Sequence, residues 1–220
     1  IAWELGGVQL AAFVGALASV ALVWRIAGIG SGEERIASVL LVGYAVASLL
    51  AAALSLVMLA SGANLRAIFG FLLGGLDGVT WPRLAAAALP IAIATLLLVR
   101  RGRALAAFLL GDEGATHLGI DVRRERRIAV ALATLATASA VALTGLIGFV
   151  GLVVPHLARL AVGSDPRAVL PLSAIGGALL LLLADTVART IGVPVGVITA
   201  LIGAPFLLWL LHRARAGYAL

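Results

Sequence analysis

Long apolar runs recur along the whole chain, separated by short polar or arginine-containing connections. Each run has the length of about 17 to 25 residues that an α-helix needs to cross roughly 30 Å of hydrocarbon. A membrane β-barrel would alternate polar and apolar positions, and this chain does not. We therefore predict an all-α, polytopic transmembrane helix bundle with seven spans, at about 6–24, 36–60, 82–99, 128–145, 149–163, 168–189 and 194–212.

The boundary between the fourth and fifth spans is the least regular part of this pattern. The run "GLIGFVGLVVPHLARL" carries Gly145, Gly148 and Gly151 at intervals of three, followed by Pro155. Glycine weakens a helix, and proline removes one of its hydrogen bonds. Residues 145–151 fit either a turn at the membrane surface or a helix that continues through.

The composition agrees with an integral membrane protein. Of the 220 residues, 63% are hydrophobic and only 12% are charged, and the mean hydropathy is +1.17. A soluble domain has about 25% charged residues. The isoelectric point near 11.4 would suit a nucleic-acid-binding protein. However, the arginines flank apolar spans instead of forming a solvated basic face, so we expect no nucleic-acid partner.

Several kinds of chemistry have no support in the sequence. There is no cysteine for a disulfide or a thiolate, and no lysine for a phosphate-binding loop, so the chain is not expected to hydrolyse ATP or to be an enzyme. His117, His156 and His212 lie far apart and have no carboxylates at ligand spacing. We therefore predict no metal site, and we interpret His156 as a packed polar residue at a helix bend.

The arginines predict the orientation of the bundle. If the loop after the first span is cytoplasmic, thirteen arginines fall on the cytoplasmic side and three on the other, which is a strong bias under the positive-inside rule. The C-terminus is then cytoplasmic and the visible N-terminus is outside. The cytoplasmic set is Arg25, Arg35, Arg100, Arg101, Arg103, Arg123, Arg124, Arg126, Arg127, Arg159, Arg167, Arg213 and Arg215, and the outer set is Arg66, Arg83 and Arg189.

Two connections are long enough to hold structure of their own. The outer one, residues 61–81, has an apolar middle that is too short to span and predicts a short helix near the outer surface. The inner one, residues 100–127, predicts a compact helical element on the cytoplasmic side. Asp112 and Glu113 stand where that helix would begin, because negative charge stabilises the positive end of a helix dipole. Residues 118–120 would end it.

Asp185 and Arg189 are spaced i, i+4 near the outer end of the sixth span. Ionisable residues inside a membrane are often functional, so Asp185 is a candidate proton site. The alternative, which we favour, is an ion pair along one helix face that neutralises both charges.

Several strings together resemble one family. The run from "TGLIGFVGLVVPHLARL" to "LLADTVAR", followed by "PVGVITALIGAPFLLWLL", is similar to the FecCD family of permease subunits, which serve ABC importers of iron–siderophores, haem and cobalamin. The similarity continues upstream through "LLGDEGATHLGID", "FGFLLGGLDGVTW" and "AAFVGAL". It covers essentially the whole chain as a single permease domain, 1–220, with the cytoplasmic coupling segment 100–127 inside it. Members have ten spans, so this chain corresponds to spans four to ten and about three helices would precede it.

The resemblance implies partners. Two permease subunits, as a homo- or heterodimer in membrane lipid, would form the pathway above two ABC ATPase subunits that use ATP and Mg²⁺. No cofactor would bind the permease directly. An extracytoplasmic substrate-binding protein would deliver the chelate, which we expect to be an iron–siderophore. The location implied is the bacterial cytoplasmic (inner) membrane.

The resemblance also implies roles for particular residues. Arg189 matches an outer arginine that docks the binding protein, and residues 28–35 match a cytoplasmic gate. Residues 145–160 become a tight re-entry followed by a bent helix, which makes Gly145, Gly148, Gly151 and Pro155 hinge or pathway candidates. The ATPase-coupling residues would be Asp112, Glu113, Gly114, Ala115, Thr116, His117, Leu118 and Gly119.

Two alternatives to an importer permease stay open at this point. One is a proton-coupled secondary transporter that uses Asp185. The other is a truncated, non-functional permease fragment.

Overall fold

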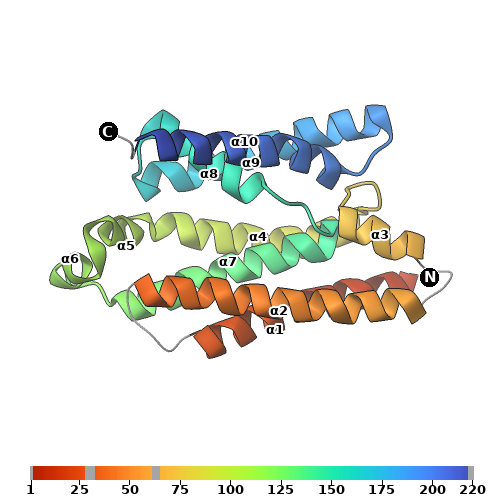
Figure 1. The fold of residues 1–220 in the computed structure, drawn as a ribbon, viewed down its shortest axis with the longest axis horizontal. Helices are drawn as coiled ribbons and strands as arrows, with labels where there is room; N and C mark the ends of the chain where they lie inside the picture. Colours follow the sequence, from red (N-terminus) through yellow and green to blue (C-terminus); the bar gives the residue numbers. More distant parts are fainter. Residues whose placement is uncertain (1, 28–32, 61–64, 218–220) are drawn as a thin grey trace. The chain divides into compact units, whose positions relative to one another are not determined.

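The structure of the chain, a computed structural model, describes residues 2–27, 33–60 and 65–217 (Figure 1). All regular elements among these residues are helices, as predicted. The chain separates into two compact units, Ile1–Gly70 and Phe71–Leu220, and each is described by itself. The single permease domain therefore stays a prediction.

The first unit consists of two long helices that pack on each other, α1 (Ala2–Ala27) and α2 (Glu33–Ala60). They correspond to the first two predicted spans. Large apolar side chains such as Leu40, Leu41 and Leu59 are exposed along α2, as they are on a helix that faces lipid. Residues 28–32 of the expected gate lie outside the described residues.

The second unit arranges its long helices in two groups (Figure 1). In one group α4 packs along α7, and in the other α8 and α10 pack on α9. The short helix α3 (Leu65–Leu73), expected in the outer connection, leads into this unit. The remaining elements are α4 (Trp81–Arg100), α5 (Gly102–Ala107), η2 (Phe108–Leu110), α6 (Gly111–His117), α7 (Val122–Thr144), α8 (Val150–Val162), α9 (Pro166–Ile191) and α10 (Val195–Gly217).

Each predicted span contains a helix, but one of these helices is shorter than the membrane is thick. Within the described residues, six helices are long and apolar enough to cross a membrane. The seventh, α8, has 13 residues. At 1.5 Å per residue it rises about 20 Å, which is less than the roughly 30 Å of hydrocarbon. The helix predicted at 149–163 is thus confirmed to within one residue at each end, but it is too short to cross the hydrocarbon by itself.

A non-helical stretch, residues 145–149, leads from α7 into this short helix. Gly145 contacts the backbone of Phe71 and Gly74 at the end of α3, and Arg167 packs against Gly102 just after α4. Because α7 packs along α4, the chain from 145 to 167 returns along the length of a 20-residue helix. A non-helical stretch and a short helix together make this pass.

Buried side chains in the second unit are small. Ala94, Ala115, Ala184 and Val195 are almost completely buried, whereas most of the large leucines lie at the surface. Membrane helices associate through such small residues, because lipid is as apolar as leucine and offers no hydrophobic reason to bury large side chains.

Candidate functional site

The predicted coupling segment folds as a knob, which we define as residues 102–120, between the ends of α4 and α7. It contains α5, η2 and α6 in succession. Its small core consists of Ala107 and Ala115 packed on Val122, the first residue of α7. Phe108 and Ile120 cover this core from the sides. The knob is therefore a packed element joined to α7 and not an open loop.

Glycine ends α6 in the manner of a Schellman motif. The N–H of Ile120 donates to the carbonyl of Ala115 at 3.1 Å, and the N–H of Gly119 donates to that of Thr116 at 2.9 Å. Gly119 has φ +77°, which glycine adopts without steric cost. Asp112 and Glu113 lie in the first turn, as predicted.

Two ion pairs fix the knob end of the bundle. Arg101, at the end of α4, donates through Nη1 to both carboxylate oxygens of Glu125 on α7, at 2.6 Å. Arg126 donates through Nη2 to Oδ1 of Asp112 at 2.8 Å, and its guanidinium lies 5.9 Å from the ring centre of Phe108. The first pair joins two spans, and the second joins the knob to a span.

The knob presents an apolar and acidic surface to solvent. Leu109, Leu110 and Leu118 are 60%, 65% and 62% exposed. Most of the eight predicted coupling residues are also exposed, with two exceptions: Gly114 is half-buried and Ala115 is fully buried. Ala115 can therefore act only through the core of the knob. The exposed leucines can bind a groove on a partner.

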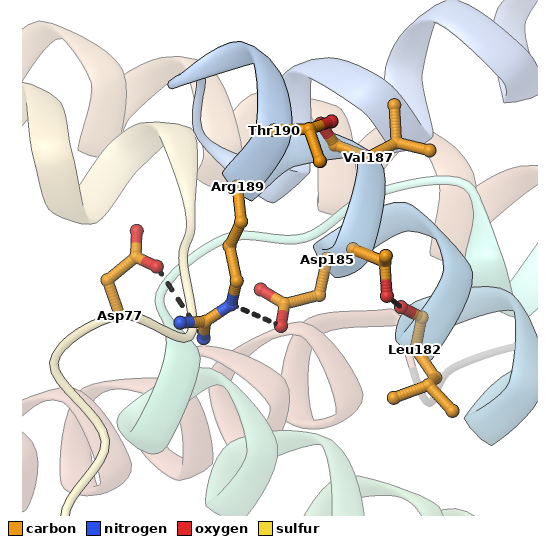
Figure 2. A network of polar contacts seen from close by, with 7 residues as sticks. Asp77, Leu182, Asp185, Val187, Arg189 and Thr190 are labelled. Carbon is orange, nitrogen blue, oxygen red and sulfur yellow. Dashed lines mark hydrogen bonds and ion pairs between the residues drawn. The ribbon is translucent and has the colours of Figure 1, made fainter.

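Arg189 lies at the opposite end of the second unit, between two carboxylates (Figure 2). Its Nε donates to Oδ2 of Asp185 at 2.7 Å, which confirms the predicted i, i+4 pair. Its Nη2 lies 3.6 Å from Oδ1 of Asp77, in the connection between α3 and α4. The side chain of Asp185 is 15% exposed, whereas that of Arg189 is 54% exposed and accessible to a partner.

The four hinge candidates differ in their surroundings. Gly145 has φ +71° and packs against the backbone of Phe71 and Gly74, so it ends α7 in a conformation open to glycine. A Cβ added at Gly148 or Gly151 would meet no atom within 4 Å beyond its chain neighbours, and neither glycine has positive φ. Pro155 lies inside α8 and removes a helical hydrogen bond there. Only Gly145 is fixed by its contacts.

Gly145 belongs to a contact between backbones, the glycine junction, which we define as Gly74, Gly145 and Gly196. Gly196, in the first turn of α10, lies against the carbonyls of Leu73 and Leu146. Main-chain hydrogen bonds cross the junction: Gly75 N–H donates to Thr144 at 2.8 Å, and Leu146 N–H donates to Phe71 at 3.2 Å. Three segments therefore meet there without intervening side chains.

Phe149 begins α8 with φ 66°, an uncommon value for a residue with a side chain. Its side chain occupies the place where a Cβ at Gly203 of α10 would lie. His156, the residue after Pro155 in α8, meets Phe206 of α10 edge to face, with ring centres 5.9 Å apart. These contacts agree with the interpretation of His156 as a packed residue.

The family model of the FecCD transport family matches residues 2–213. The chain belongs to the FecCD transport family. It is 45% identical over 208 residues to the cobalamin import system permease protein BtuC of Halobacterium salinarum, covering 94% of this chain and 56% of the relative. It is 39% identical over 212 residues to the hemin transport system permease protein HmuU of Yersinia pestis, covering 94% and 63%.

A further FecCD-type relative is the Fe(3+) dicitrate transport system permease protein FecD of Escherichia coli, 38% identical over 94% of this chain and 65% of its own length. A solved structure described as an inward-facing conformation of a transporter assigned to the metal-chelate ABC type matches with a TM-score of 0.82. The two are 28% identical over 95% of this chain and 72% of that one. The chain thus spans less than two thirds of the length of these curated relatives.

Some contacts of the candidate sites in this FecCD chain could not be found from the sequence. Asp77 was not predicted as a partner of Arg189, although it stands in the polar end of the outer connection, on the side predicted for that arginine. The Arg101–Glu125 pair joins residues 24 positions apart, and no spacing rule indicates it. Gly74 and Gly196 gave no signal beyond being glycines in a glycine-rich chain.

Proposed function

We propose that the chain is part of the transmembrane permease subunit of an ATP-driven, binding-protein-dependent importer of a metal chelate. Membership of the FecCD family supports this proposal, together with the names of the cobalamin, hemin and Fe(3+) dicitrate relatives. The observation that carries it is the knob: a packed element with exposed leucines, joined by an ion pair to α7 beside a second pair that ties α4 to α7. ATP hydrolysis would belong to a separate partner subunit that uses Mg²⁺.

The knob has the properties that a coupling element needs. Its core and its Schellman motif hold it in one shape, Arg126 connects it to α7, and the Arg101–Glu125 pair ties the adjoining ends of α4 and α7 together. A displacement of the knob by a partner would therefore move these spans rather than deform a loop. The partner proposed is the ABC ATPase subunit, on the cytoplasmic side given by the arginine distribution.

A double substitution of Leu109 and Leu118 by Ser tests this role. In the assembled importer that contains this chain, we expect at least tenfold less co-purified ATPase and loss of vanadate-sensitive uptake, because two exposed apolar anchors are removed. Arg103→Ser, also on the knob and exposed, is the control and should leave both unchanged. Normal ATPase binding by the double variant would refute the role of the knob.

Arg189 is proposed to dock the extracytoplasmic binding protein through a carboxylate. Its guanidinium is half-exposed and already held in position by Asp185. Charged pairs of this kind set orientation and encounter rate more than affinity. Arg189→Glu should slow association at low salt by about tenfold, whereas Arg83→Glu, an equal charge change on the same predicted side, should not. Equal effects of the two variants would contradict specific docking.

The specific cargo that we propose is an iron–siderophore. Cobalamin and haem are tested as competing substrates in the same uptake assay. The assay also separates the importer from a proton-coupled transporter. The importer requires ATP, is inhibited by vanadate, and keeps its pH dependence when Asp185 is replaced by Asn. Uptake that persists in vanadate and collapses with the proton gradient would favour the proton-coupled transporter.

A further inference from the structure

The sequence "RRERR", residues 123–127 at the start of α7, divides into two sets with different surroundings. Glu125 and Arg126 face the knob end and are paired with Arg101 and Asp112. The other three arginines are exposed. No ion pair to Arg123, Arg124 or Arg127 exists among the residues that the structure describes. A run of charges that only marked the end of a span would not need this division.

The three unpaired arginines line one surface pocket. Its volume is about 500 Å³, and it is lined by Asp121, Arg123, Arg124, Arg127 and Ile128. Residues three and four positions apart share a helix face, which brings Arg127 beside Arg123 and Arg124 and brings Ile128 next to Arg124. Asp121 is the N-cap of α7, and its Oδ1 accepts the N–H of Arg124 at 3.0 Å. Three cations against one anion leave the lining with a net charge of +2.

The pocket lies where α7 changes from charged to apolar. α7 is one of the helices long and apolar enough to cross a membrane, and it contains no charged residue from Ile128 to Thr144. Ile128 forms the apolar edge of the pocket, and Ala131, one turn beyond Arg127, is exposed. A ligand there would therefore meet guanidinium groups at one end and a hydrocarbon-facing helix at the other.

We propose that this pocket binds the headgroup phosphate of an anionic phospholipid, with its acyl chains along α7 beyond Ile128. Guanidinium groups bind phosphate oxygens through paired, charge-assisted hydrogen bonds. Basic pockets at the ends of membrane helices suit anionic headgroups. The adjoining apolar face can contact acyl chains, which a phospholipid has and a soluble phosphate compound lacks. None of the three arginines takes part in the two ion pairs at the knob end of the bundle.

Binding of lipid to the purified chain in detergent tests the proposal by native mass spectrometry. The probes are phosphatidylglycerol and phosphatidylcholine of identical acyl chains. The unaltered chain should bind phosphatidylglycerol at least tenfold more tightly, and Arg123→Gln, Arg124→Gln, Arg127→Gln together should abolish that preference. The matched control replaces Arg100, Arg103 and Arg159 by Gln, which removes the same charge from exposed arginines outside the pocket and should preserve the preference.

Three results would overturn the proposal: no preference for phosphatidylglycerol, an equal loss in the two triple variants, or displacement of the lipid by millimolar inorganic phosphate. If the pocket variant does not fold, the three single Arg→Gln variants replace it, and each should weaken phosphatidylglycerol binding about fivefold. Loss of ATPase co-purification in the pocket variant with unchanged lipid binding would identify the pocket as a protein-binding surface instead. The lipid assay contains no ATPase, so failure of the proposed coupling leaves its result unaffected.

Discussion

Replacement of Gly145 by alanine should destabilise the bundle far more than the same change at the two glycines that follow it. Gly145 has φ +71° and ψ −159°, a region that residues with side chains hardly occupy. Holding alanine there costs about 1–3 kcal/mol. The new Cβ would also collide with the carbonyl oxygen of Phe71 and lie 3.2 Å from its carbonyl carbon. These are backbone atoms that cannot rotate away, which adds about 1–3 kcal/mol.

The two costs overlap, because a shift of the chain that relieves one partly relieves the other. Alanine also restricts the unfolded chain, which returns about 0.4–1 kcal/mol. We therefore expect Gly145→Ala to lower the free energy of unfolding by about 1–5 kcal/mol. Gly148→Ala meets no atom within 4 Å and should change it by less than about 0.5 kcal/mol. Gly151→Ala lies inside α8 and should be neutral or stabilising by about 0.5–1 kcal/mol.

The assay is reversible unfolding by sodium dodecyl sulfate in mixed micelles, followed by circular dichroism for the three alanine variants and the unaltered chain. The three glycines stand at equal spacing in one apolar run, so insertion and composition are closely matched among the variants. If Gly145→Ala and Gly148→Ala unfold at the same detergent fraction, the glycine junction does not hold the unit together, and the reasoning from its contacts fails.

Two further predictions concern the knob end. Ala115→Leu should overpack the core of the knob, where Ala115 is fully buried, and destabilise the knob by about 1–3 kcal/mol. Hydrogen exchange of the knob amides should become faster while the amides of the spans stay protected. Unchanged exchange of the knob amides would contradict the packed core. Double-mutant cycles should give a coupling of about 1–3 kcal/mol for Arg101–Glu125, whose glutamate is only 18% exposed. The more exposed Arg126–Asp112 pair should give a coupling of about 0.2–1 kcal/mol. A larger coupling for this pair than for Arg101–Glu125 would refute the argument that the more buried pair is the stronger one.

Positions of the helices could be predicted from the sequence because their signals are local. A long apolar run needs no knowledge of its neighbours to be read as a helix, and the Asp185–Arg189 pair follows from the spacing of one helix turn. The end of α6 was also local: Gly119 follows the last residues of a short helix and adopts the conformation that ends it. These features were all confirmed.

The features that were missed depend on segments far apart in the chain. Residues 145–149 are as apolar as the helix after them, so hydropathy cannot show that their backbone is not helical. Gly74 and Gly196 become significant only when three segments meet, and Asp77 becomes a partner of Arg189 only when the α3–α4 connection folds against α9. Such contacts are tertiary. They cannot be predicted from a single sequence, because no rule of residue spacing indicates them.

The non-helical stretch at residues 145–149 has a consequence for how the chain enters a membrane. A complete helix satisfies its own backbone and can enter lipid alone, but a non-helical stretch leaves its N–H and C=O groups to neighbours. Leu146 depends on Phe71, which is already made, whereas the contact with Gly196 involves a segment that the ribosome delivers later. Insertion is therefore not a series of independent helices. Residues 145–149 rely on α7 and α3, which precede them in the chain, for backbone hydrogen bonds that a helix would make within itself.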